Sequence, residues 1–188
     1  MTDAMGAIRR LHQHRDWVNQ NLLESARALN DEQLRKAFEI GQGSVWKSMV
    51  HMYAAEYVWL EALLGHEDPL VQGDLPGHLP GNQLGQGTIA SLNELSGLWC
   101  KLEGRWSQFL TTINPESLEQ VVYKISSNSA LGRFGTKQLD ILLHVCTHAH
   151  YTAAQVINML RQCGVQKFPG TMVVMMARQE AQTSPSSG

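Results

Sequence analysis

The sequence is poor in cysteine, and the cysteines it has form no recognisable pattern. Among its 188 residues are Cys100, Cys146 and Cys163, an odd number at spacings that match neither a disulfide framework nor a zinc knuckle. We therefore expect three free thiols that behave as small apolar residues in a reducing compartment.

Long apolar runs and clusters of positive charge are also missing. No stretch approaches the roughly 18 apolar residues of a membrane span, and the opening MTDAMGAIRRLHQHRDW is too polar for a signal peptide. The 15 Lys and Arg are scattered among 17 Asp and Glu, which leaves no basic stripe for nucleic acid. These absences predict a cytoplasmic protein that binds neither membranes nor nucleic acid.

Length and composition predict one globular domain. A chain of 188 residues with 43% hydrophobic residues can bury a core of its own, and it contains no internal repeat. We assign residues 1–178 to this domain. Residues 179–188, which end in QTSPSSG, are expected to form a disordered tail.

Hydrophobic periodicity predicts four long helices. With their caps they are expected over 4–29, 44–64, 88–113 and 136–163, with a short helical turn over 31–38. Ser44, Thr88 and Thr136 are the expected first residues of the last three helices, and Gly65 and Gly164 the expected stops. Four long helices with one long connection indicate an all-α four-helix bundle.

Three segments between or after these helices have different compositions. Residues 65–87 are rich in proline and glycine, which predicts a long surface loop that could cover a pocket. The stretch LEQVVYKIS, 118–126, followed by SSNSALGRFG, predicts a short strand or hairpin. FPGTMVVMMARQE, after the last long helix, is expected to form a short strand or helix on the bundle.

The stretch HVCTHAHYTAAQ, residues 144–155, places three histidines on the fourth expected helix. At about 100° per residue, His148 lies on the apolar face, His144 flanks it and His150 points to solvent. A single imidazole on an apolar face is more often a hydrogen-bonded core residue than a metal ligand. The spacing of His144 and His148 by one turn is nevertheless one that can bind a single metal.

The second expected helix adds His51 as a further candidate. Its most apolar seam contains Trp46, Met49 and Tyr53, whereas His51 lies on a second face with Ala55 and other small apolar residues. Such a face could admit a close neighbouring helix and leave space around the imidazole. Because the helix is apolar almost all round, a solvent-facing His51 stays open as the alternative.

Two other groups of residues have a plain structural explanation. Cys146 and His150 lie one turn apart and could form a thiolate–imidazole pair, but no acidic residue is placed to orient the imidazole. Aromatic residues of the second and third helices, such as Trp59 and Trp99, could line a ligand pocket. We expect them more often in the core or in a subunit interface.

These residues together resemble the DinB superfamily, whose DinB and YfiT-like members are four-helix bundles. The likeness covers nearly the whole chain and includes HQHRDWVNQNLLESARALNDEQL, VWKSMVHMYAAEYVWLEALLG, LEQVVYKISSNSALGRFGTKQ and LLHVCTHAHYTAAQVINMLRQCG. The resemblance implies a divalent metal, often nickel or zinc, bound at one end of the bundle. One histidine of the second helix and two of the fourth are the ligands in that family.

The resemblance is incomplete at the third ligand. The family's fourth helix usually reads HVxxHxxxHRGQ, in which the second and third histidines bind the metal. Here His148 matches the second of these and His51 the ligand from the second helix, whereas Thr152 stands at the third. A hydroxyl is a poor substitute for imidazole on such metals, and a catalytic zinc usually has three protein ligands.

The missing imidazole leaves the third ligand undecided. It stays open between His144, one turn before His148, and Thr152 itself, with Gln155 or Tyr151 as other oxygen donors. A metal-free pocket at His51 and His148 is the alternative that the substitution favours. In that case Thr152 is expected to fill space and to hydrogen bond a carbonyl oxygen one turn back.

The resemblance implies two functions. In the first, the chain is a metal-dependent transferase that uses a small thiol such as mycothiol or bacillithiol, or a metal-dependent hydrolase. In the second, it is a non-catalytic, metal-free homodimeric bundle whose degenerate site binds a small molecule or serves the structure. We expect a homodimer in either case.

Overall fold

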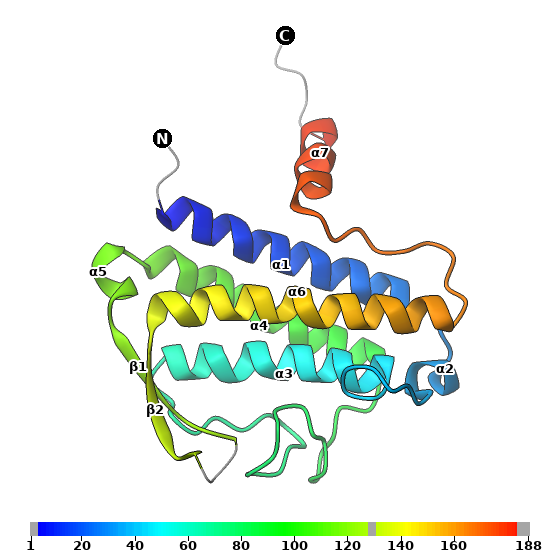
Figure 1. Ribbon diagram of the computed structural model, residues 1–188, viewed down its shortest axis with the longest axis horizontal. Helices are drawn as coiled ribbons and strands as arrows, with labels where there is room; N and C mark the ends of the chain where they lie inside the picture. Colours follow the sequence, from blue (N-terminus) through cyan, green and yellow to red (C-terminus); the bar gives the residue numbers. More distant parts are fainter. Residues whose placement is uncertain (1–3, 128–130, 184–188) are drawn as a thin grey trace.

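Four long helices are the main elements of the computed structural model, which describes residues 4–127 and 131–183 (Figure 1). The helices are α1 (Ala4–Ala26), α2 (Asp31–Arg35), α3 (Val45–Leu63), α4 (Leu92–Thr112), α5 (Pro115–Leu118), α6 (Gln138–Gln162) and α7 (Val173–Thr183). The strands are β1 (Val121–Ile125) and β2 (Arg133–Lys137). The described chain is thus mostly helical, as an all-α fold requires.

The four long helices α1, α3, α4 and α6, here called the helical core, lie side by side. Helix α6 packs on α1 and α3, and α4 packs on the same two helices (Figure 1). Their apolar faces meet in one cluster, in which Leu22, Met49, Trp99 and Leu142 are almost fully buried. The two helices that carry the candidate histidines, α3 and α6, are therefore direct neighbours.

Helix ends follow local sequence signals. The Ser44 side chain accepts a hydrogen bond from the Lys47 amide and caps α3, as expected. Gly65 and Gly164, which follow α3 and α6, have φ angles of 95° and 84°. Both glycines therefore end their helices in the left-handed conformation that glycine adopts without strain.

Helix α4 begins at Leu92, and Ser91, not Thr88, is its N-cap. The Ser91 hydroxyl accepts a hydrogen bond from the Glu94 amide at 3.2 Å. Residues 88–90 precede the helix, and the Ile89 amide donates to Gln83 of the preceding loop at 2.7 Å. The expectation for Thr88 was wrong since the S-x-x-E signal at Ser91 is the stronger one.

The expected hairpin is present between α5 and α6. Strands β1 and β2 are antiparallel, with Val122 opposite Thr136, and the turn residues 128–130 lie outside the described part. Thr136 therefore belongs to β2 and does not open a helix. Helix α6 starts at Gln138, where the pairing ends.

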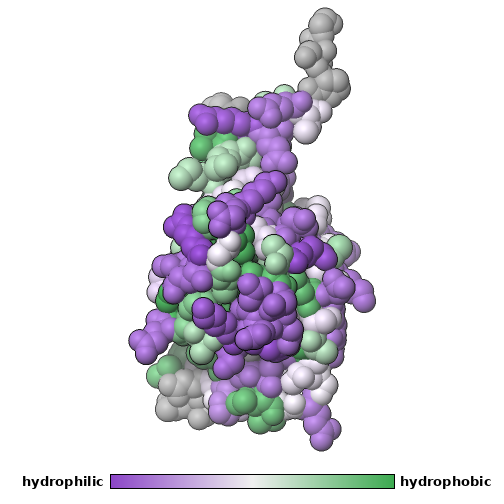
Figure 2. All heavy atoms as spheres, turned by 90° about the vertical axis from the view of Figure 1, so that its right-hand side faces the viewer, coloured by the Kyte–Doolittle hydropathy of each residue, from purple (hydrophilic) through white to green (hydrophobic). Residues whose placement is uncertain are grey.

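Helix α7 rises from the helical core, as the end-on view of Figure 2 also shows. Arg10 of α1 forms an ion pair of 2.7 Å with Glu180, and the Trp17 indole donates to Gln179 at 3.2 Å. Residues 179–183, assigned above to a disordered tail, are therefore helical, and 184–188 lie outside the described residues. Among the described helices, none has the length and apolar character needed to cross a membrane.

Candidate functional site

His51 is buried on α3, with 8% of its surface exposed, which excludes the solvent-facing alternative. Its Nδ1 lies 2.7 Å from the carbonyl oxygen of Pro80. Because a carbonyl oxygen only accepts, Nδ1 carries the proton and donates it. In the neutral ring, Nε2 is consequently unprotonated, and its lone pair is available.

The loop 65–87 holds this arrangement in place. Both oxygens of the buried Asp74 carboxylate accept backbone hydrogen bonds, from Gly81 at 2.6 Å and from Gln83 at 2.9 Å. Gly81 lies so close to α3 that a Cβ there would be 2.8 Å from the Cα of His51. Glycine at 81 thus lets the loop approach the helix and deliver the Pro80 carbonyl to His51.

His148 on α6 faces His51 across the contact between the two helices. Their Nε2 atoms are 3.2 Å apart, and the ring planes meet at 72°. Since His51 Nε2 has no proton, His148 Nε2 supplies the proton of this contact when both rings are neutral. The structure therefore brings together the two histidines that the sequence singled out.

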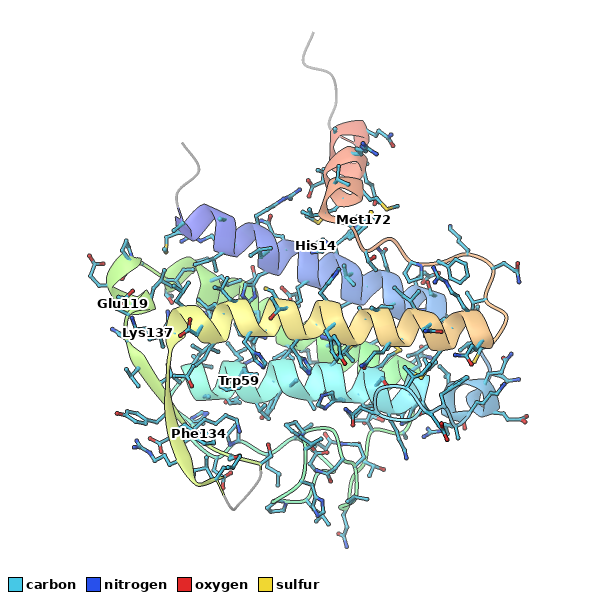
Figure 3. The ribbon with its side chains drawn as sticks, in the orientation of Figure 1. His14, Trp59, Glu119, Phe134, Lys137 and Met172 are labelled. Atoms are coloured by element: carbon cyan, nitrogen blue, oxygen red, sulfur yellow. The ribbon has the colours of Figure 1, made fainter. Side chains whose placement is uncertain are left out.

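A small pocket of about 150 Å³ opens at the histidine pair. Its lining includes His51, Trp59, Pro80, Lys124, His144 and His148. The residues come from α3, the loop 65–87, β1 and α6, and Trp59 is seen on α3 beside the hairpin in Figure 3. The two imidazoles thus face a cavity in which a small ligand has room.

The two candidates for a third ligand are placed differently. His144 lines the pocket, and its ring centroid is 5.7 Å from that of His148 and 5.5 Å from that of Trp59. Thr152 is buried, with 3% of its surface exposed, and is not among the described residues that line the pocket. Within 4–127 and 131–183, no three His, Cys, Asp or Glu side chains are grouped closely enough to hold a metal.

Burial favours the neutral form of two pocket histidines, His148 and His144. It lowers the pKa of His148 to about 4, and the positive charges that His51 and His144 can carry lower it further. Burial also lowers the pKa of His144. At pH 7, His148 is therefore a neutral imidazole, which is the form that binds metals.

Cys146 and His150 do not form a nucleophile–base pair. Burial raises the pKa of the Cys146 thiol to about 12, so the thiol stays protonated at neutral pH. His150 is exposed on α6, and its ring neighbour is His14 of α1, with centroids 6.3 Å apart. The prediction that His150 points to solvent is confirmed.

A second polar group, which sequence reasoning missed, lies inside the helical core. We call it the ionic network. Arg15, with a fully buried side chain, contacts the Glu103 carboxylate and lies 3.5 Å from Glu56. Its guanidinium also donates to His12 Nδ1 at 2.9 Å. One cation thus faces two carboxylates, and burial raises the pKa of Glu103 to about 7.

The Glu56 carboxylate has further partners in the ionic network. It accepts hydrogen bonds from Asn19 at 2.8 Å and from the Trp99 indole at 3.0 Å. Burial raises the pKa of Glu56 as well. The sequence signal was the spacing of Arg15 and Asn19 on α1, one turn apart on the same stripe as the core residue Leu22.

Two comparisons with known proteins agree with the resemblance seen in the sequence. The sequence model described as DinB family matches residues 1–183. Protein DinB of Bacillus subtilis (strain 168) is 24% identical over 164 residues, which cover 85% of this chain and 88% of that relative. The family match includes both helices of the histidine pair, α3 and α6.

Proposed function

This chain belongs to the DinB family, and we propose that it is an enzyme whose divalent metal, nickel or zinc, is bound by His51 and His148. The observation that carries the proposal is the distance of 3.2 Å between the two Nε2 atoms. The helical core would then have the four-helix bundle arrangement of the DinB and YfiT-like type, with the metal between its second and fourth long helices.

The two imidazoles suit a shared metal in distance, and the unprotonated Nε2 of His51 is already directed at the site. Nitrogens that bind one zinc at about 2.1 Å with tetrahedral angles lie about 3.4 Å from each other. The observed 3.2 Å is close to this value. The bond from His51 Nδ1 to the Pro80 carbonyl oxygen is the kind of outer contact that orients a ligating histidine.

His144, which would have to move closer to the pair, is our candidate for the third protein ligand. It is an imidazole that lines the same pocket, whereas Thr152 is absent from the described lining and offers only a hydroxyl. A turn of α6 separates His144 from His148, a spacing that allows two histidines to bind one metal. Solvent molecules would complete the coordination.

The proposed chemistry is transfer of a small thiol or hydrolysis. A bound divalent cation would supply Lewis acidity, which lowers the pKa of a thiol or water that coordinates it. The protein's own part is to hold two imidazoles 3.2 Å apart and to orient His51 through the loop 65–87. The pocket of about 150 Å³ restricts what can reach them.

The second candidate is a metal-free homodimer whose pocket binds a small molecule or serves the structure. The specific observation in its favour is that Thr152, at the family's third ligand position, is a buried residue outside the described pocket lining. With two imidazoles and no third strong ligand, metal affinity would fall.

Metal content distinguishes these candidates. The protein is purified without a histidine tag or chelator, and its metal is measured as wild type, His51→Ala and His150→Ala. We expect stoichiometric nickel or zinc in the wild type, its loss in His51→Ala, and retention in His150→Ala, because His150 is exposed on the same helix as His148. Absence of metal from all three proteins, even after incubation with zinc, would rule out the metalloenzyme proposal.

A further inference from the structure

Lys124 lies on the inner face of the β hairpin. Along β1, exposed residues alternate with half-buried ones, and Val122 and Lys124 occupy the half-buried positions. Successive side chains of a strand point to opposite faces, so Lys124 shares the inward face with an apolar residue. This orientation brings a long cationic side chain to the wall of the pocket that contains His51 and His148.

The Lys124 ammonium has no ion-pair partner among the described residues. Its Nζ donates to the carbonyl oxygen of the adjacent Ile125 at 2.9 Å, and no carboxylate of the described chain lies within 4 Å. Lys137 on the other strand is different, since it pairs with Glu119 at 2.7 Å; both are labelled in Figure 3. Of these two lysines, Lys124 is thus the one without a carboxylate partner among the described residues.

The surroundings of Lys124 favour an anion. None of the described residues that line the pocket is acidic. Burial lowers the pKa of Lys124, against the opposite influence of Asp68, which lies beyond ion-pair distance. The Lys124 ammonium contacts the Ile125 carbonyl oxygen and lies 5.9 Å from the centre of the Trp59 ring, but it has no carboxylate partner among the described residues. A half-buried cation of this kind is stabilised when a ligand brings the opposite charge.

We propose that the pocket binds a small carboxylic acid, whose carboxylate pairs with the Lys124 ammonium while the rest of the molecule faces His51 and His148. This names the ligand class of the pocket on which the proposed function rests. One ammonium balances the single charge of a carboxylate, whereas a phosphate monoester carries close to two. The cavity of about 150 Å³ has the volume of about five water molecules in the liquid, which limits the ligand to a few heavy atoms.

The test uses metal-free, full-length protein, so that it does not depend on the metal. Chelator-treated wild type is titrated with propionate and with propionamide, its uncharged equivalent of the same size, and binding is followed by shifts of the backbone amides in NMR spectra. Lys124→Met should weaken propionate binding by about tenfold or more, as loss of a charge-assisted hydrogen bond requires, and leave propionamide unchanged. Lys137→Met, which removes a cation from the same hairpin, should change neither.

The proposal is overturned if wild type binds propionate and propionamide equally, or if Lys124→Met binds propionate as well as wild type with an otherwise unchanged spectrum. An inward lysine would then only protect the edge of the two-stranded sheet. A parallel zinc titration keeps the two proposals apart. We expect His51→Ala to lose zinc but keep propionate binding, and Lys124→Met to do the reverse.

Discussion

The ionic network and the histidine pocket are two polar groups that share helix α3, and their polar atoms are bonded in different ways. In the ionic network, Arg15, Glu56 and Asn19 bond to each other and to neighbouring core residues. In the pocket, His51 has one nitrogen bonded to the loop 65–87 and the other directed at His148 beside a cavity.

The difference separates a structural role from a binding role. Buried polar groups whose charges are mostly paired with one another specify how helices pack and leave little room for a ligand, although Arg15 Nε and Asn19 Oδ1 have no hydrogen-bond partner among the described residues. Polar groups that are hydrogen bonded on one side and face a cavity on the other are available to bind a ligand. Substitutions in the two groups should therefore have different consequences.

Arg15→Met should be the most destabilising of these changes. It leaves the buried Glu56 carboxylate without its cation, and loss of one partner from a buried ion pair lowers the free energy of unfolding by about 3–5 kcal/mol. Urea denaturation measures the change. The exposed Lys101→Met on α4 is the control and should have almost no effect. If Glu56 is the cause, adding Glu56→Gln to Arg15→Met should recover part of the loss.

The ionic network should also make stability depend on pH through Glu103. Burial raises its pKa from 4.5 to about 7, so the folded protein holds the proton more tightly than the unfolded chain does. The contribution of this carboxyl is full below about pH 4.5 and is lost as the pH rises through about 7. This rise in the pKa of Glu103 corresponds to about 3 kcal/mol of unfolding free energy.

Unfolding free energies of wild type and Glu103→Gln, measured by urea denaturation between pH 4.5 and 8, reveal this contribution as a difference. We expect wild type to lose stability relative to Glu103→Gln across this range, since glutamine cannot ionise. Other titrating groups, His12 among them, are common to both proteins. Two parallel curves would mean that Arg15 offsets the burial of Glu103 completely.

At the pocket, Gly81→Ala and Gly77→Ala form a matched pair in the loop 65–87. Both glycines have positive φ angles, 81° and 78°, but a Cβ at 81 meets the His51 backbone at 2.8 Å, whereas a Cβ at 77 has no neighbour within 4 Å. Gly77→Ala should lower the unfolding free energy by about 1 kcal/mol, from its backbone conformation alone. Gly81→Ala should lower it by about 2 kcal/mol more, in the range of overpacking.

The same two glycine variants also test whether the loop 65–87 orients His51. Only Gly81→Ala displaces the Pro80 carbonyl from His51, so only this variant should also bind zinc more weakly in a calorimetric titration. Equal zinc affinities in the two variants would show that the loop does not orient His51.

Thr152→His should have the smallest effect of these changes, measured as free energy of metal binding. Unlike Gly81→Ala, it should strengthen metal binding. A third imidazole at the family's ligand position should raise zinc or nickel affinity by about tenfold or more, because a catalytic site usually has three protein ligands. Thr147→His, on the exposed face of α6, is the control. If Thr152→His binds no more tightly than Thr147→His, the alignment of this helix with the family pattern is wrong.

The sequence was a good guide to elements and to the histidine pair. Periodicity on α3 and α6 placed His51 and His148 on faces that could meet, and cap signals placed most helix ends. It left the orientation of His51 open because α3 is apolar almost all round. The loop that resolves this has no periodicity, and its position depends on Asp74, which bonds within the loop, and on Gly81, which contacts the distant His51.

The ionic network and Lys124 were harder to foresee for a physical reason. A polar residue on an apolar helix face, such as Arg15, is visible in the sequence, but its partners on α3 and α4 come close only when the helices pack. The register of the hairpin decides that Lys124 faces inward, and a shift by one residue would turn it to solvent. Pairwise geometry of this kind is set by tertiary packing.

The most direct test of the account is a crystal structure of the untagged protein grown with zinc, with anomalous diffraction recorded on both sides of the zinc absorption edge. We predict one strong peak at bonding distance, about 2.1 Å, from the Nε2 atoms of both His51 and His148. A pocket without a peak, while zinc occupies exposed histidines such as His150, would contradict the claim that this pair is a metal centre.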